Sequence, residues 1–349
     1  MKILVVADLH LTNKNSKFKI GKNGVSDLLE AQKQFIEYIV EKHLKTQECD
    51  YFVFLGDYTD SEILDPITLN YAAYIMSLIT NHCEGSIWLE GNHCIDDRGM
   101  VNTVMSGFKR LNVPDVHWVV TEPSVCKLDR VKFYAVPYSD DYAKSQETIE
   151  RYNLSLNSDY INILLFHFPT TNALLDNSFP ASRGLSLTDK EIGNFDLVLG
   201  GDYHKRQKLL NASSAYYVGA PFMFTFNEDR DKGYMIIEIK DDEISIEQHN
   251  NPFLYEMIKT DQNSFESLDL LDKSKSIVQV EDCDEENFSK FAGMRQDYYK
   301  LSLRKTSNKV KVEKTQRRKP LSLEEYVLQS DLEDKEGIIE LVKEMALEA

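Results

Sequence analysis

The chain has few cysteines and no long hydrophobic run. Its five cysteines lie far apart and form no Cys-x-x-Cys pair. This spacing excludes a disulfide framework and a zinc knuckle, so we expect a reduced, intracellular protein. No stretch approaches the roughly 18 consecutive apolar residues of a membrane-spanning helix. The apolar part of the N-terminal MKILVVADLH is too short for a signal peptide and predicts a buried strand instead.

The chain has fewer basic than acidic residues. The 349 residues include 40 Lys and Arg against 57 Asp and Glu, for a formal net charge of −17. A protein that binds nucleic acid on its own usually carries a basic face that neutralises phosphates, so this balance argues against an autonomous nucleic-acid binder. It does not exclude a nuclease, because metal ions can supply local positive charge and a partner subunit can supply the rest.

Apolar runs alternate with helical patterns through the first 200 residues. The runs at 3–7, 51–57 and 86–92 are followed by patterns with helical spacing at 26–45, 66–81 and 100–111. This alternation is typical of an α/β layered sheet. The later runs lie closer together, at 116–120, 131–138, 161–167, 195–201, 215–221, 233–239 and 243–249. We therefore expect a β-sandwich flanked by helices over residues 1–250.

A domain boundary is predicted near Asn250-Asn251-Pro252. Helical patterns at 264–271 and 284–292, with strand patterns at 276–280, 298–304 and 309–313, predict a small α+β domain over residues 251–313. Residues 304–319 hold eight Lys and Arg against one Glu. Residues 314–320 are then a basic linker, which is either a solvated connector or an arm that contacts nucleic acid.

The last segment, 321–349, predicts a helical tail. Ser322 and Glu325 have the spacing of a capping box, with Leu321 and Tyr326 placed for a hydrophobic staple. An apolar face with helical spacing follows, formed by Ile338, Leu341, Val342 and Met345. This face either packs on the chain's own domain or docks on a partner.

Five short polar motifs each follow an apolar run, where a strand should end. They are Asp8-Leu9-His10, Gly56-Asp57-Tyr58-Thr59-Asp60, Gly91-Asn92-His93, His167 and Gly201-Asp202-Tyr203-His204. Each alone has an ordinary explanation, such as a turn or a core histidine. Because the carboxyl ends of the strands form the ligand-binding rim of an open α/β sheet, all five should converge at one site.

The residue types in these motifs indicate metal chemistry. Three aspartates, three histidines and one asparagine suit manganese, iron or zinc better than calcium. Seven ligands are too many for one ion. Two ions about 3.5–4 Å apart, sharing one carboxylate, use them all and form the usual clamp for attack on a phosphate ester.

In this order, over residues 1–250, the motifs resemble the calcineurin-like metallophosphoesterase superfamily. The stretches GGDYHKRQ and YVGAPFMFTFNEDRDKGYMIIEI resemble the SbcD nuclease family, in particular the nuclease subunits of bacteriophage recombination endonucleases. The resemblance implies that 251–313 is a DNA-capping domain and that 321–349 binds an SbcC-like coiled-coil ATPase. It also implies a homodimer within a heterotetramer that acts on DNA ends, in a prokaryotic or phage-infected cytoplasm and away from membranes.

The resemblance also implies roles for the motif residues. The first metal ion would be held by Asp8, His10, Asp57 and His204, and the second by Asp57, Asn92, His167 and Asp202. We expect Mn²⁺, or Mg²⁺, at both positions. His93 would stabilise the transition state or protonate the leaving oxygen, a task suited to a group whose pKa lies near neutrality.

Two positions depart from the family pattern. Asp202 stands where the family usually has His, which favours Mn or Mg over zinc, and Cys94 stands where it usually has Asp. We interpret Cys94 as a core thiol rather than a redox switch. Asp60 is expected to accept a hydrogen bond outside the metal's own ligands, or alternatively to orient substrate.

Three functions follow as hypotheses. The first is a two-metal DNA exonuclease and endonuclease subunit of an SbcCD-like recombination and repair complex. The second is a stand-alone phosphodiesterase acting on a small phosphodiester or a phosphoprotein, which the acidic charge favours. A scaffold without chemistry is disfavoured by the intact Asp57, Asn92 and His93. One candidate dimer face, which core packing explains equally well, comprises Ile67, Tyr71, Tyr74, Ile75 and Leu78.

Overall fold

The computed structural model describes residues 1–95, 103–109, 117–175, 179–226 and 228–305. Residues Met1–Arg304 form one compact unit. The strand predicted at 309–313, the linker at 314–320 and the tail at 321–349 lie outside the described residues.

The first sheet has the order β12-β11-β1-β2-β3-β4. Its four parallel strands are β1 (Lys2–Val6), β2 (Tyr51–Leu55), β3 (Gly85–Leu89) and β4 (His117–Val120). The strands β11 (Gly233–Lys240) and β12 (Glu243–Asn250) form a hairpin, which joins the sheet by antiparallel pairing of β11 with β1. Side chains alternate along each strand, so Leu4 and Val6 enter one core while Ile3 and Val5 enter another. Both faces of this sheet are therefore covered.

The second sheet has the order β5-β6-β7-β8-β10-β9. Its strands are β5 (Ser124–Leu128), β6 (Val131–Val136), β7 (Ile161–His167), β8 (Leu197–Gly201), β10 (Ala215–Tyr217) and β9 (Gln207–Lys208). On β7, Ile163 and Leu165 share a core with Ile3 and Val5 of the first sheet. The two sheets thus pack face to face across one apolar layer.

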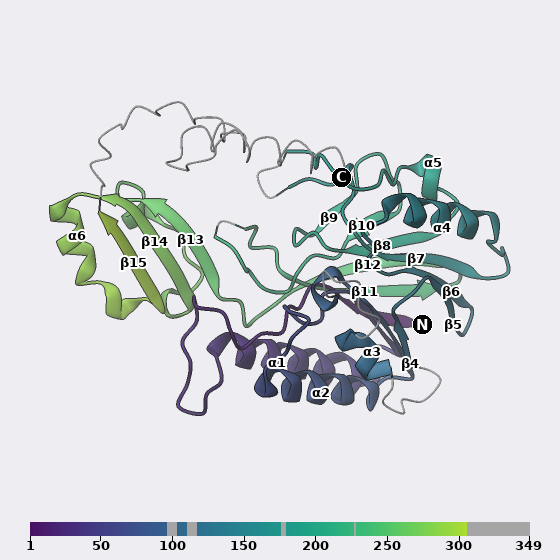
Figure 1. Ribbon diagram of the computed structural model, residues 1–349, viewed down its shortest axis with the longest axis horizontal. Helices are drawn as coiled ribbons and strands as arrows, with labels where there is room; N and C mark the ends of the chain where they lie inside the picture. Colours follow the sequence, from purple (N-terminus) through teal and green to yellow (C-terminus); the bar gives the residue numbers. More distant parts are fainter. Residues whose placement is uncertain (96–102, 110–116, 176–178, 227, 306–349) are drawn as a thin grey trace, which may run out of the picture. The chain divides into compact units, whose positions relative to one another are not determined.

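Helices cover the outer face of each sheet (Figure 1). On the first sheet lie α1 (Asp27–Ile39), extended by a π-helical turn at Val40–Leu44, α2 (Pro66–Thr80) and α3 (Val104–Lys109); on the second lie α4 (Tyr142–Leu154) and α5 (Asp189–Ile192). Ser26 caps α1 by accepting from the Leu29 amide at 3.1 Å, and Asp65 caps α2 just before Pro66. The predicted mixed α/β fold, with sheets flanked by helices, is confirmed.

A third sheet, β13-β14-β15, follows the β11–β12 hairpin. It contains β13 (Glu256–Asp261), β14 (Ser276–Cys283) and β15 (Lys300–Lys305), with α6 (Glu285–Ala292) and short 3₁₀ turns at Phe265–Ser267, Lys273–Lys275 and Arg295–Asp297. The helix expected at 264–271 is wrong, because only the 3₁₀ turn forms there. Leu268 and Leu270 instead pack against the small core of this sheet from a loop.

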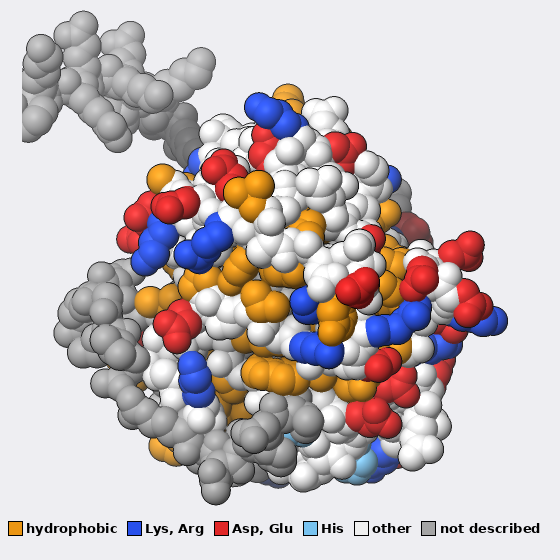
Figure 2. Space-filling model, turned by 90° about the vertical axis from the view of Figure 1, so that its right-hand side faces the viewer, with side chains coloured by type: hydrophobic (Ala, Val, Ile, Leu, Met, Phe, Trp, Pro, Cys, Tyr) orange, Lys and Arg blue, Asp and Glu red, His pale blue; other side chains and the backbone are white. Residues whose placement is uncertain are grey.

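The surface carries apolar side chains in two notable places. On the face in Figure 2 they gather in a band flanked by charged side chains. On α2, Leu69 and Tyr74 are 49% and 43% exposed, whereas Ile75 is buried in the core. Core packing thus explains part of the proposed dimer face, and the dimer stays a prediction. Among the described residues, no helix has the length and apolarity needed to cross a membrane.

Candidate metal centre

The polar motifs meet where parallel strands of both sheets end. Asp8 and His10 follow β1, Asp57 follows β2, and Asn92 and His93 lie in a 3₁₀ turn (Asn92–Cys94) after β3. From the second sheet, His167 is the last residue of β7, while Asp202 and His204 follow β8. The predicted residues therefore come from two sheets whose strand ends converge.

The backbone at these strand ends is unusual. Asp8, His10, Asp57 and Asp202 all have positive φ angles, of 50°, 47°, 53° and 102°. Such angles are uncommon outside glycine and cluster at functional sites, where the surroundings hold the strained conformation. Here the loops hold one another, because the Asp8 amide donates to Gly56 O at 3.1 Å and the His10 amide donates to Asp57 O at 2.9 Å.

Two glycines make room for the site side chains. A Cβ on Gly56, whose φ is +90°, would lie 2.0 Å from His167 Nδ1. A Cβ on Gly91 would lie 2.2 Å from both the amide nitrogen and Oδ1 of Asp57. Glycine therefore stands at these positions because the imidazole and the carboxylate pack directly against the backbone.

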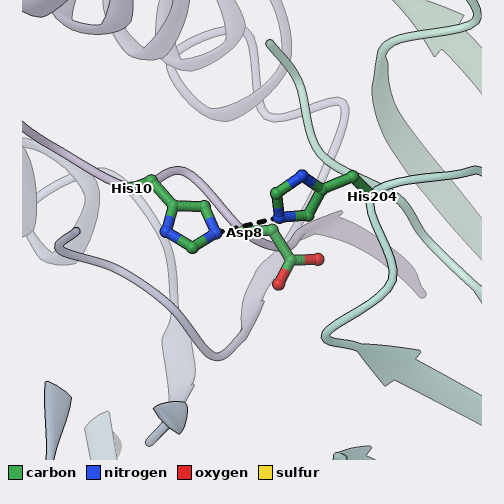
Figure 3. A group of neighbouring side chains, drawn as sticks. All are labelled: Asp8, His10 and His204. Atoms are coloured by element: carbon green, nitrogen blue, oxygen red, sulfur yellow. Dashed lines mark hydrogen bonds between the residues drawn. The ribbon is translucent and has the colours of Figure 1, made fainter. Parts of the chain in front are cut away.

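The first group of potential ligands consists of Asp8, His10 and His204 (Figure 3). The two imidazoles approach each other from different segments, with their Nε2 atoms 3.1 Å apart. Asp8 is fully buried, and its Oδ2 has no hydrogen-bond partner among the described residues. A buried carboxylate oxygen and two imidazole nitrogens directed to one place form a donor set that fits a divalent cation.

The second group consists of Asp8, Asp57 and His167. His167 is fully buried, and its Nδ1 lies 2.6 Å from the Leu55 carbonyl oxygen, which leaves Nε2 to face the site. That Nε2 lies 3.1 Å from Asn92 Oδ1 and 3.5 Å from Asp57 Oδ1. This group fits a second cation, with the second nitrogen of the histidine held by a carbonyl as metal-ligating histidines usually are.

Asp57 lies between the two groups. Its Oδ2 is 3.5 Å from His10 Nε2, and its Oδ1 is 3.5 Å from His167 Nε2. One carboxylate thus directs one oxygen to each group, which is the arrangement expected of a shared ligand. The His93 amide also donates to Oδ1 at 2.9 Å and fixes the orientation of the carboxylate.

His93 and Asp60 lie at the open side of the site. Both side chains are more than two-fifths exposed, at 41% and 45%. His93 Nδ1 is 3.0 Å from the Asp60 carbonyl oxygen, and its Nε2 is 4.0 Å from Asp57 Oδ2. Asp60 Oδ1 also lies 3.4 Å from His10 Nδ1. His10, Asp60 and His93 thus form a third group of side chains that could hold a metal ion, at the exposed side of the site.

The two positions that depart from the family pattern differ in their surroundings. Asp202 belongs to none of these groups of potential ligands; its amide donates to Asp8 Oδ1 at 3.0 Å. Cys94 is fully buried, with Sγ 3.7 Å from Thr59 Oγ1, and burial raises the pKa of its thiol to about 11. The structure thus places Cys94 in the core.

The acidic site strongly perturbs its titratable groups. Burial acts to raise the pKa of Asp57, but the neighbouring His167 and His10 outweigh it and lower that pKa. Burial acts to lower the pKa of His167, but Asp57 outweighs it and raises the value to about 10. Burial, with Asp8 and Asp57 nearby, raises the pKa of Asp202 to about 6. Three carboxylates crowded in this way favour positive charge between them.

Sequence analysis missed several residues beside the site. Phe224 packs its ring edge-on against His10 and His204, with centroid distances of 4.9 and 5.3 Å. Glu228 and Lys232 form a buried ion pair next to His204. All three lie in the segment between β10 and β11, where the apolar residues follow neither helical nor strand spacing.

The fold and the ligand groups together define a metal-dependent phosphoesterase. Residues 1–206 match the model of the calcineurin-like phosphoesterase family, and the chain belongs to that family. Its members use divalent metals, and the groups around Asp57 provide a place for them. The expected metallophosphoesterase membership is thereby confirmed.

Solved structures with similar folds have little sequence identity to this chain. A dimetal phosphatase from Danio rerio is 8% identical, covering 72% of this chain and 96% of its own, with a TM-score of 0.48. GAP50, the anchor in the inner membrane complex of Plasmodium, is 11% identical over 72% and 85%, with a TM-score of 0.45. TT1561 of Thermus thermophilus is 13% identical over 71% and 98%, with a TM-score of 0.41. No curated protein matches the sequence.

Proposed function

We propose that the chain is the nuclease subunit of an SbcCD-like recombination and repair complex. It would be a two-metal-dependent DNA exonuclease and endonuclease that hydrolyses phosphodiesters with metal-activated water. The family membership supports the phosphoester chemistry. The observation that favours an extended polyanionic substrate over a small one is a lysine-rich loop beside the metal centre.

This lysine loop comprises residues 13–25, between β1 and α1. It carries four lysines and no acidic residue, in a chain whose net charge is −17. Lys14, Lys19 and Lys22 are exposed. Lysines that neutralise phosphates supply most of the sequence-independent affinity for DNA, and a small phosphodiester would not need three of them.

The remaining lysine of the loop, Lys17, connects it to the metal centre. Lys17 Nζ donates to the Phe224 carbonyl oxygen at 2.7 Å, and the Phe224 ring packs on His10 and His204. From the third sheet, Lys300 Nζ donates to the Ser16 carbonyl oxygen at 2.9 Å. These contacts anchor the loop beside the metal centre at Ser16 and Lys17, so its exposed lysines would be available to a DNA backbone that enters the site.

The seven predicted ligands would hold two divalent cations, which when bound lower the pKa of attacking water and offset charge on the phosphoryl oxygens. His93 is suited to protonate the leaving oxygen. Its Nδ1 can donate to the Asp60 carbonyl oxygen at 3.0 Å, which leaves Nε2 directed to the site near Asp57. Cys94 is buried and takes no part.

The second candidate is a stand-alone phosphodiesterase for a small phosphodiester or a phosphoprotein. The net charge of −17 favours it, because such a chain binds DNA poorly by itself. The nuclease proposal meets this objection with a partner: an SbcC-like ATPase bound through residues 321–349 would share the contact with DNA ends. Within that complex, two copies of the chain would form a homodimer in a heterotetramer.

An assay on linear DNA with added Mn²⁺ separates the two candidates. Wild-type protein with the ATPase partner should degrade DNA, and Asp8→Asn should abolish this activity together with hydrolysis of a nitrophenyl phosphodiester. Replacement of Lys14, Lys19 and Lys22 by alanine should reduce DNA cleavage but leave hydrolysis of the small diester unchanged. For every lysine that no longer neutralises a phosphate, the slope of log affinity against log salt should fall by about 0.9.

A matched control replaces three exposed lysines elsewhere, Lys144, Lys190 and Lys240, by alanine. This variant has the same change in net charge and should cleave DNA as wild type does. If wild-type protein hydrolyses the nitrophenyl diester but leaves DNA intact even with the partner, the nuclease proposal is wrong. Equal loss of DNA cleavage in both triple variants would show that the lysine loop has no specific role in binding DNA.

A further inference from the structure

A buried ion pair lies behind His204, on the side away from His10. Glu228 and Lys232 are only 6% and 1% exposed, and Lys232 Nζ lies 2.8 Å from Glu228 Oε2. Desolvation of two charges costs several kcal/mol per ion in a protein interior, so a buried pair is a poor device for stability alone. Its position beside a metal ligand indicates a function.

The Glu228 carboxylate is held rigidly by its first oxygen. Oε1 accepts from the Phe224 amide at 3.1 Å, the Thr225 amide at 2.6 Å and the Thr225 hydroxyl at 2.8 Å. Since these donors come from the turn that also carries Phe224 to the site, the carboxylate cannot rotate without breaking three hydrogen bonds.

The second oxygen is directed toward His204. Oε2 lies 3.9 Å from His204 Nδ1 and, apart from its ion pair with Lys232, makes no hydrogen bond within the part of the chain that the structure describes. The opposite nitrogen, Nε2, faces His10 Nε2 at 3.1 Å (Figure 3). His204 therefore has one nitrogen toward the potential metal and the other toward a buried carboxylate.

We propose that Glu228, supported by Lys232, is the positioning residue for His204. Glu228 keeps the proton of the imidazole on Nδ1, so the lone pair of Nε2 faces the cation. Lys232 holds the backbone of the same residue, because its Nζ donates to the His204 carbonyl oxygen at 2.9 Å. Metal-ligating histidines usually donate their second N–H to such a partner, which fixes the ring and raises its basicity.

This inference rests on the proposed two-metal site but is independent of the DNA substrate. A purely structural role is the competing explanation, since the pair also joins the turn at Phe224 to β11. The two differ in what they predict for metal affinity. A positioning role weakens the binding of one of the two ions, whereas a purely structural role weakens both ions equally or neither.

The test compares Glu228→Gln with wild type in Mn²⁺ titrations of the full chain. Binding is monitored by calorimetry and by the electron paramagnetic resonance signal of free Mn²⁺. We expect wild type to bind two ions. The variant should bind one of them roughly 10- to 100-fold more weakly and the other unchanged. The melting temperature of the metal-free variant should fall, because Lys232 is left buried without its carboxylate, so both proteins are titrated at a temperature where they are folded.

The matched control is Glu48→Gln. Glu48 Oε2 lies 2.6 Å from Nδ1 of the buried His43, so it forms a carboxylate–histidine pair outside the ligand groups. This variant should bind both ions as wild type does. Wild-type affinity for both ions in Glu228→Gln would overturn the inference, as would equal weakening of both. Absence of Mn²⁺ binding by wild type would instead overturn the two-metal site itself.

A second measurement is made on wild-type protein and uses a variant only to assign one signal. Long-range ¹H–¹⁵N spectra of wild-type imidazoles, recorded with saturating Zn²⁺, report which ring nitrogen carries the proton. The His204 signal, assigned as the one missing from His204→Asn, should be that of the Nδ1–H tautomer. An Nε2–H tautomer would overturn the proposal.

Discussion

Replacing Gly91 by alanine should disable the metal centre without unfolding the protein. The new Cβ would lie 2.2 Å from the amide nitrogen and from Oδ1 of Asp57, so the backbone at Asp57 must move. The φ angle of Gly91 is −108°, which alanine adopts freely, so the effect is one of steric overlap alone.

The magnitude follows from the size of that displacement. Relief of the overlap requires a shift of about 1 Å, and overpacking of this kind costs about 1–3 kcal/mol of stability. Asp57 directs one oxygen toward His10 and the other toward His167, so a shift disturbs both groups at once. Misplacement by about 1 Å can cost on the order of 100-fold in rate.

The assay measures kcat for a nitrophenyl phosphodiester, Mn²⁺ affinity and the melting temperature on the same samples. Gly91→Ala should lose on the order of 100-fold in kcat and bind both ions more weakly. The control is Gly107→Ala in α3, where a Cβ meets no atom within 4 Å; it should keep full activity and gain about 0.5–1 kcal/mol of stability. Wild-type activity and metal affinity in Gly91→Ala would refute the reasoning.

Three further predictions concern other parts of the chain. Burial raises the pKa of Glu90 from 4.5 to about 7, so its contribution to stability is full below pH 4.5 and is lost as the pH rises through 7. Denaturant titrations at pH 5 and pH 8 should show that Glu90→Gln removes this loss, worth about 3 kcal/mol, and an unchanged pH dependence would contradict it. Cys94 should stay unmodified by a thiol reagent at pH 8 in the folded protein, as judged by mass spectrometry, because it is fully buried; rapid modification would show that it is not a core thiol. Deletion of 321–349 should leave diester hydrolysis intact and abolish co-purification with the ATPase, and surviving association would disprove the tail assignment.

The site could be predicted from the sequence because its residues follow strands. Apolar runs such as 3–7 and 161–167 are long and regular enough to be recognised as buried strands. Parallel pairing then places the residues after β1, β2 and β3 at one edge, and those after β7 and β8 at another. What the sequence could not supply is the packing of one sheet on the other, which joins these edges.

Elements without apolar periodicity escaped prediction. Helix α4 buries Ser145 and Thr148 beside Ile149 and Tyr152, so its inner face is half polar. Strand β13 begins with Glu256, a buried acid that pairs with Arg230. The opposite error occurred at 264–271, where closely spaced leucines imitate a helix. In all three segments tertiary contacts determine which side chains are buried, and they override the local sequence pattern.

Glu228 escaped for a related reason. It lies 24 residues after His204 in an irregular turn, and no spacing rule connects a carboxylate in such a turn to a ligand. Only the course of the chain from β10 through Phe224 to β11 brings it behind the imidazole. Residues that position ligands are therefore harder to predict than the ligands themselves.

Anomalous diffraction from crystals soaked in Mn²⁺ tests the central claim most directly. We predict two peaks about 3.5–4 Å apart. One should lie beside Asp8, His10 and His204, the other beside Asn92 and His167, and Asp57 should contact both. A single peak, or two peaks that do not share Asp57, would contradict the two-metal account.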